Sequence, residues 1–300
     1  MYTQLMDEKD LSQKVRELEN IIALQKKQLD EYQFLIESTN ERLQFFIQQL
    51  RHDLQKLRDL QKILVPKQIK KIPGMEFSSR FVPGSKIGGD YYDIFPIKNS
   101  QSFGVILSSS GSHGLSSLVL SIMVAVGPRI DSCQDGSALQ QATETLINNV
   151  RQHMEPQDEW HFFYGVFDKK YLRMDFYSFG NIGIAFQKTD RSAFESNEIQ
   201  LPCITKESAP SFNQQQIQLD PSGRFILASP GVINIRGATP SENWIHFLNF
   251  QLGNGKDVKH IHDLRNHVFR WARKMSGPQP TRDQTVIIAQ VTERAIRLAT

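Results

Sequence analysis

The first 65 residues contain neither proline nor glycine, the two residues that most often interrupt a helix. In the same stretch apolar residues recur at every seventh position, and a second, incomplete series follows three positions later. The first series is Val15, Ile22, Leu29, Ile36, Leu43, Leu50, Leu57 and Leu64, and the second is Leu18, Tyr32, Phe46 and Leu60. This heptad repeat predicts one long helix over residues 1–65 that forms a coiled coil.

A strict period of seven keeps its apolar stripe buried only when two helices supercoil around each other. Residues 11–64 would span roughly 80 Å as a helix, longer than one domain is wide. We therefore expect a parallel coiled-coil homodimer, with the two series above as its interface. The alternatives are a helix that packs on its own domain and a coiled coil with a different protein. Gln25, Thr39 and Asp53 fall in the second series, where polar residues favour a defined register.

Composition excludes several classes of partner. The chain has 35 Lys and Arg against 32 Asp and Glu, and a net charge of +3 over 300 residues gives no strong field for nucleic acid or anionic lipid. The longest apolar run, Leu118 to Val126, is far shorter than the roughly 20 residues that cross a bilayer. Two cysteines without metal-ligand spacing, and no secretory leader, favour a cytoplasmic protein.

Pro66 ends the helical pattern, and residues 66–74 are typical of a short linker. From residue 75 to residue 293 short β-rich runs alternate with few helical segments, which predicts an α+β domain of packed sheets. The expected strands are Met75 to Val82, Ser102 to Leu107, His161 to Phe167, Leu172 to Phe179, Gly183 to Gln187, Arg224 to Leu227 and Thr285 to Val291. The expected helices are Ser116 to Val126, Ala138 to Val150 and Asp257 to Lys274.

Several motifs occur in a fixed order in this domain. Gly88-Gly89-Asp90-Tyr91-Tyr92-Asp93 resembles the Gly-Gly-Asp-x-Tyr-Asp signature of SpoIIE-type and RsbU-type phosphatases, bacterial members of the PPM class of serine/threonine phosphatases. Ser108 to Gly114 is similar to the Asp-Val-Ser-Gly-His-Gly motif of this family, and Phe179 to Gly183 to its Asn-Ala-Gly-His turn. Ser229-Pro230-Gly231-Val232 and Arg282-Asp283-Gln284-Thr285 resemble its Thr-Asp-Gly-Val and Asp-Asp-x-Thr motifs.

The resemblance implies a four-layer αββα sandwich of two antiparallel sheets flanked by helices, with the site at one edge. It also implies two Mn²⁺ or Mg²⁺ ions, which carboxylates hold so that a bridging water attacks the phosphorus. Of the four ligand positions that the motifs imply, only Asp90 keeps a carboxylate, because Ser108, Pro230 and Arg282 occupy the others. A neutral hydroxyl, an apolar ring and a fixed positive charge are poor replacements. No catalytic residue, metal or other cofactor is therefore expected.

The expected vestigial site consists of Gly89, Asp90, Asp93, Ser108, Ser109, Gly111, His113, Gly114, Pro230, Gly231, Arg282 and Asp283. For several of these residues two interpretations stay open. Asp90 and Asp93 either bond turn backbone or keep residual metal binding, and His113 is either structural or a ligand of phosphate or metal. The serine run 108–110 forms either an anion-binding loop or a loop that caps the next helix. A shift of register would bring Asp283 into the site as a ligand.

These observations favour a pseudophosphatase that dimerises and binds a protein partner in bacterial signalling. By resemblance, that partner is an anti-anti-sigma-type regulator or another signalling protein. The first alternative is an active metal-dependent serine/threonine phosphatase that acts on a phosphoserine regulator and uses Mn²⁺ or Mg²⁺. The second is a structural coiled-coil protein with an inert globular cap.

Overall fold

The structure is a computed structural model, and contacts divide the chain into two compact units, Met1–Lys56 and Leu57–Thr300, which are considered separately. The described residues are 8–64, 69, 71–85, 89–98, 100–111, 115–130, 137–189, 192–196, 201–208, 210–233, 242–243, 246–253, 257–277 and 279–292. None of the described helices is long and apolar enough to cross a lipid bilayer.

Helix α1 is continuous over 57 residues, Glu8–Leu64, as expected for a segment without helix breakers. The apolar residues of its heptad series are exposed wherever their side chains are described, with Leu29 at 65% and Ile36 at 60%. Of the predicted interface, the side chains of Leu57 and Leu64 lie outside the described residues. Thr39, a polar residue in the second series, donates its hydroxyl proton to the Leu35 carbonyl at 2.7 Å.

The globular unit contains two antiparallel sheets, which we call sheet A and sheet B. Sheet A has the strand order β1-β9-β8-β6 and sheet B the order β2-β3-β4-β5-β7. The strands of sheet A are β1 Met75–Val82, β6 Gly183–Gln187, β8 Arg224–Ala228 and β9 Gln284–Val291. The strands of sheet B are β2 Tyr91–Pro96, β3 Ser102–Ser110, β4 Trp160–Asp168, β5 Arg173–Phe179 and β7 Gln215–Gln218.

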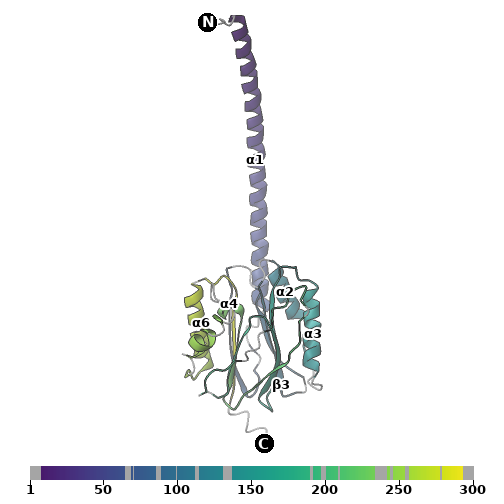
Figure 1. Cartoon of the computed structure of the whole chain (residues 1–300), viewed down its shortest axis with the longest axis vertical. Coiled ribbons are helices and arrows are strands. Elements are labelled where there is room, and N and C mark those ends of the chain that lie inside the picture. The colour runs from purple at the N-terminus through teal and green to yellow at the C-terminus, as the bar shows by residue number, and fades with distance from the viewer. Residues whose placement is uncertain are drawn as a thin grey trace, which may run out of the picture. The chain divides into compact units, whose positions relative to one another are not determined.

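Helices cover both outer faces of the two sheets (Figure 1). Helices α2 and α3 cover sheet B, and α4 and α6 lie on the side of sheet A. The helices are α2 Leu115–Val126, α3 Ala138–Arg151, α4 Pro230–Ile233, α6 Ile261–Ser276 and the π-helix η1 Phe247–Leu252. The predicted αββα sandwich behind a long helix is confirmed.

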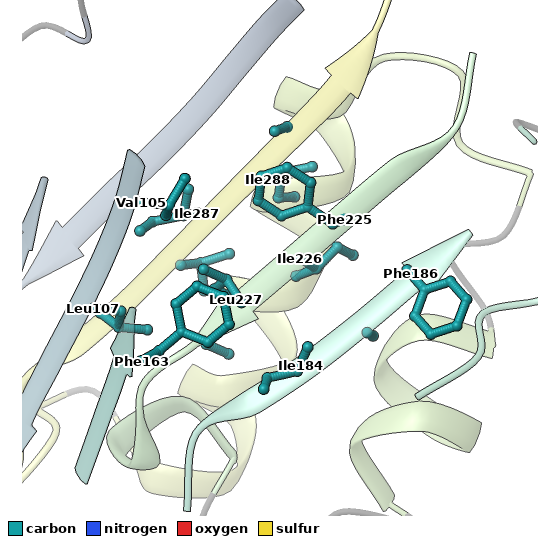
Figure 2. Packing of buried hydrophobic residues seen from close by; sticks show 14 of the residues in the cluster. Val105, Leu107, Phe163, Ile184, Phe186, Phe225, Ile226, Leu227, Ile287 and Ile288 are labelled. Atoms are coloured by element: carbon teal, nitrogen blue, oxygen red, sulfur yellow. The ribbon is translucent and has the colours of Figure 1, made fainter. Parts of the chain in front are cut away.

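The main core lies between the sheets because alternate residues of each strand point inward. Val105, Leu107 and Phe163 of sheet B meet Leu227 and Ile287 of sheet A in this layer (Figure 2). A second cluster on the outer face of sheet B packs against α2 and α3 and includes Trp160, Tyr164, Leu120 and Leu146. Both faces of sheet B are therefore buried, and all nine residues of β3 are buried.

Two strands were not predicted, and one predicted loop was wrong. Strands β2 and β7 were missed, β2 because its residues were interpreted only as a motif and β7 because Gln215–Gln218 is short and polar. The serine run 108–110 was predicted as a loop, but it belongs to β3. Ser108, Ser109 and Ser110 stay in the strand because they pair with Phe162, His161 and Trp160 of β4.

Candidate functional site

The predicted site residue Asp90 lies just before β2 and is almost fully buried, with 2% of its surface exposed. Its Oδ1 accepts a hydrogen bond from the Ser109 hydroxyl at 2.5 Å. Its Oδ2 accepts one from the Thr285 hydroxyl at 2.7 Å. Ser109 lies near the C-terminal end of β3 in sheet B and Thr285 near the N-terminal end of β9 in sheet A, so one carboxylate connects the two sheets.

Asp283 is a second buried carboxylate beside Asp90. Its Oδ2 accepts a hydrogen bond from the Asp90 backbone N–H at 3.3 Å, and its Oδ1 accepts one from the Gly84 N–H at 2.8 Å. Residue 283, and not the preceding Arg282, therefore faces Asp90. The register shift that the sequence analysis left open is the arrangement found in the structure.

The proximity of the two carboxylates changes the acidity of Asp90. Burial first, and then the charge of Asp283, raise the pKa of Asp90 to about 7. Hydrogen bonds from the hydroxyls of Ser109, Ser229 and Thr285 act in the opposite direction. The donors stabilise the ionised carboxylate but do not offset its desolvation. Near neutral pH, protonated and ionised Asp90 are therefore both populated.

Strand alternation decides which serine of β3 faces this pair. The side chains of Phe103, Val105 and Leu107 belong to the inner core, and Ser109 continues that line to Asp90. Ser108 points to the opposite face, where its hydroxyl accepts a hydrogen bond from the Trp160 indole N–H at 2.8 Å. Of these two predicted site residues, Ser109 therefore faces Asp90 and Ser108 does not.

The Asp283 backbone fits closely between two glycines. A Cβ atom on Gly231 would lie 1.9 Å from the Asp283 carbonyl oxygen, and one on Gly84 would lie 2.5 Å from the Arg282 carbonyl carbon. Gly231 also accepts a hydrogen bond on its carbonyl from the Gln284 side-chain amide at 2.9 Å. The predicted site residue Pro230 is buried at the start of α4, where it supplies no side-chain ligand.

The other predicted site residues are less closely connected. Asp93 points away from Asp90 and forms an ion pair with Arg129 at 3.4 Å. Gly89 is buried where a Cβ would lie 2.6 Å from that of Ser110, and the Gly111 N–H donates to the Glu159 carbonyl at 2.7 Å. Both glycines thus serve backbone packing. His113 and Gly114 lie outside the described residues.

His161 of β4 is a buried residue near this edge that the sequence analysis missed. Its Nδ1 accepts a hydrogen bond from the Asn181 backbone N–H at 3.1 Å, which places the proton of the neutral ring on Nε2. Burial first, and then the charge of Arg282, lower the pKa of His161 to about 4. The ring therefore stays neutral at physiological pH, and Arg282 acts on it electrostatically.

The residues present do not fit a pair of divalent cations. Both oxygens of Asp90 and both of Asp283 already accept hydrogen bonds from the chain itself. Within the described parts of the chain, no group of three or more His, Cys, Asp or Glu residues is close enough together to hold a metal ion. Two carboxylates supply too little charge for two cations, which in proteins need more oxygen ligands than this.

Two further residues beside Asp90 belong to the motifs of the sequence analysis but were not predicted as site residues. Thr285 ends the Arg282 to Thr285 motif, and Ser229 starts the Ser229 to Val232 motif. The Ser229 hydroxyl accepts a hydrogen bond from the Thr285 N–H at 2.9 Å. The motifs indicate where carboxylates are expected, so they do not predict that hydroxyl groups bond to Asp90.

Known proteins resemble this chain in structure but not detectably in sequence. No protein-family model matches the chain, and no curated protein sequence matches it. Solved structures do match: the RsbU and RsbW domains of a Mycobacterium tuberculosis protein superpose with a TM-score of 0.63 at 13% identity, covering 76% of this chain and 63% of that one. The chain thus spans less than two thirds of that structure.

Two further matching structures contain a phosphatase domain. The SiaA-PP2C domain of Pseudomonas aeruginosa has a TM-score of 0.57 at 12% identity, over 82% of this chain and 98% of its own. The PP2C phosphatase domain of SpoIIE from Bacillus subtilis, with part of its regulatory domain, has a TM-score of 0.52 at 13% identity. The match covers 73% of this chain and 62% of that one. The globular unit therefore has the fold of a PP2C-type, or PPM-type, phosphatase domain of the RsbU and SpoIIE kind.

The raised pKa of Asp90 predicts how stability depends on pH. Because the folded state holds this proton more tightly than the unfolded state, whose Asp pKa is about 4, the free energy of unfolding falls as pH rises toward 7. Asp90→Asn cannot ionise. We expect its stability relative to the natural protein to rise by on the order of 3 kcal/mol between pH 5 and pH 8, measured by urea unfolding. A constant difference at both pH values would contradict this.

The hydroxyl donors should also matter individually. Thr285→Val keeps the shape of a fully buried side chain but removes the donor to Asp90 Oδ2, and we expect it to cost about 1.5–3 kcal/mol at pH 8. The matched control is Thr143→Val, another fully buried threonine, whose hydroxyl donates to the neutral Leu139 carbonyl at 2.7 Å. Unfolding experiments that give equal losses for the two variants would show that the charge of Asp90 adds nothing.

Proposed function

We propose that this protein is a signalling module with a phosphatase fold, which binds a protein partner but does not hydrolyse phosphate esters. The observation that carries the proposal is the occupation of both Asp90 oxygens by Ser109 and Thr285 hydroxyls. A cation at Asp90 would have to compete with these donors for the carboxylate oxygens, and among the described residues only Asp283 supplies a second negative charge nearby. In this proposal, hydrogen bonds from Ser109 and Thr285 take the place of metal ligation at Asp90.

The nature of the partner is proposed from the fold neighbours. The Mycobacterium structure combines RsbU and RsbW domains, and the Pseudomonas and Bacillus structures contain PP2C domains. By this likeness we propose a signalling protein of the anti-anti-sigma type, or another regulator, as the partner. The proposed setting is the bacterial cytoplasm.

An active phosphatase is the second candidate, and one observation favours it. Asp90 and Asp283 repel each other when both are ionised, and a single cation between them would relieve that repulsion. In that case Mn²⁺ or Mg²⁺ would be the cofactor and a phosphoserine regulator the substrate. The two candidates make opposite predictions for purified protein.

A direct assay separates them. We expect millimolar Mn²⁺ or Mg²⁺ to produce no hydrolysis of an aryl phosphate or of a phosphoserine peptide above that of Asp90→Ala, because the site lacks the ligands for a metal-bound nucleophile. We also expect less than one bound metal ion per chain by elemental analysis after dialysis. Metal-dependent turnover that disappears in Asp90→Ala would establish the second candidate instead.

We further propose that α1 brings two copies of the chain together as a parallel coiled coil. The support is the exposure of its heptad series, including 62% for Ile22 and 55% for Leu43. Burying such residues contributes about 1.5–3 kcal/mol each. A seam of this length thus favours association, and the dimer would present two phosphatase-type domains to a partner.

Charge substitutions on α1 test the dimer. Ile36→Glu with Leu43→Glu places like charges in the first series, and we expect the full chain to become monomeric by light scattering at micromolar concentration. The matched control, Phe34→Glu with Phe45→Glu, removes two apolar residues that are 74% and 64% exposed but lie outside both series. The control should stay dimeric. A natural chain that is already monomeric would contradict the proposal, and loss of the dimer in both pairs would contradict the predicted seam.

A further inference from the structure

A cavity of about 550 Å³ lies on the outer face of sheet A, between β1 and α6. It exists because alternate residues of β1 point toward α6: the Ser78 hydroxyl contacts the His262 ring at 2.8 Å, and two residues further along Arg80 reaches the cavity. None of Asp90, Ser109, Asp283 and Thr285 lines it. The cavity is therefore separate from the site discussed above.

Three arginines line the cavity, Arg80, Arg270 and Arg273, and its described lining contains no carboxylate. The Arg80 guanidinium lies over the Phe269 ring, 5.0 Å from the ring centroid, so it is held in place by a cation–π contact. None of the ion pairs between described residues involves these three arginines. Among the described residues, no acidic side chain forms an ion pair that would compensate their charge.

The rest of α6 strengthens this positive charge. The helix carries Arg265 and Lys274 in addition to the two cavity arginines, against one acidic residue, Asp263. Burial first, and then the charge of Arg80, lower the pKa of Arg265, which reflects the crowding of like charges. The C-terminal end of α6 contributes only about −0.5 of a charge through its dipole. The charges of three arginines outweigh it several times over, so the lining favours anions.

The size and walls of the cavity narrow the ligand. A single phosphate would leave most of it empty, since a water molecule takes up about 30 Å³, whereas small-molecule sites measure about 300–1,000 Å³. Arginine binds phosphoryl oxygens in pairs, and three arginines provide for more than one phosphoryl group. Val82, Phe269 and Pro280 supply apolar wall for an organic part. We propose that this cavity binds an organic polyphosphate such as a nucleoside triphosphate.

Titration calorimetry on the full chain tests the proposal, with adenosine triphosphate as the probe and EDTA present to exclude divalent cations. Arg270→Gln with Arg273→Gln should weaken binding at least tenfold, because two of the phosphoryl contacts are lost. Lys274→Gln is the matched control for Arg273→Gln: it removes one charge from the same turn of α6 but lies outside the described lining. We expect it to change the affinity less than twofold. Arg80→Gln is a third variant, which removes a cavity charge contributed by β1.

Three further probes determine what the cavity recognises. Adenosine and inorganic phosphate should each bind at least tenfold more weakly than adenosine triphosphate, and a phosphoserine peptide should not compete with it. Absence of heat and of any melting shift at millimolar adenosine triphosphate overturns the proposal. So does an equal loss in Lys274→Gln and the arginine variants, which indicates a diffuse basic surface. Tighter binding of the phosphoserine peptide than of adenosine triphosphate overturns it in favour of a protein ligand.

Discussion

The buried charge of Asp90 is the constraint that organises the edge of this sandwich. A carboxylate removed from water costs several kcal/mol unless donors replace its hydration. Here the donors come from both sheets, Ser109 from β3 and Thr285 from β9, and the neighbouring Asp283 takes backbone N–H groups from Gly84 and Asp90 itself. Hydroxyl and amide groups thus hold together an edge where the resembled family would hold metal ions.

The long helix and the αββα sandwich could be predicted because each has a strong signal, a heptad repeat without helix breakers in one case and a series of motifs in fixed order in the other. The site could be predicted only as a neighbourhood. Both faces of β3 are buried, so its sequence does not alternate in polarity, and nothing in it distinguishes Ser108 from Ser109. The choice between Arg282 and Asp283 likewise depends on how the loop before β9 fits between Gly84 and Gly231, which only the folded chain determines.

The basic cavity beside α6 could not be predicted from the net charge of the chain. A balance of +3 over 300 residues suggested no charged surface, yet four of the five charged residues of α6 are basic, and two of them meet Arg80 at one cavity. Charge is separated locally because the acidic residues Glu76 of β1 and Asp263 of α6 do not line the cavity, whereas Arg80, Arg270 and Arg273 do. Gln284, which lines the cavity, directly follows Asp283 and donates its side-chain amide to Gly231. The cavity and the carboxylate pair are thus adjacent in the chain although their surroundings differ in charge.

His161 and Asp90 have opposite effects on the proton balance of this edge. His161, with its pKa near 4, stays unprotonated in the folded state and takes up a proton on unfolding below about pH 6.5. Asp90, with its pKa near 7, holds a proton when folded and releases it on unfolding above about pH 4. Between these limits the two exchanges cancel, and these two groups together contribute almost no net proton uptake to unfolding. The contribution of His161 and Asp90 to the calorimetric unfolding enthalpy near pH 5.5 is therefore almost independent of the ionisation heat of the buffer.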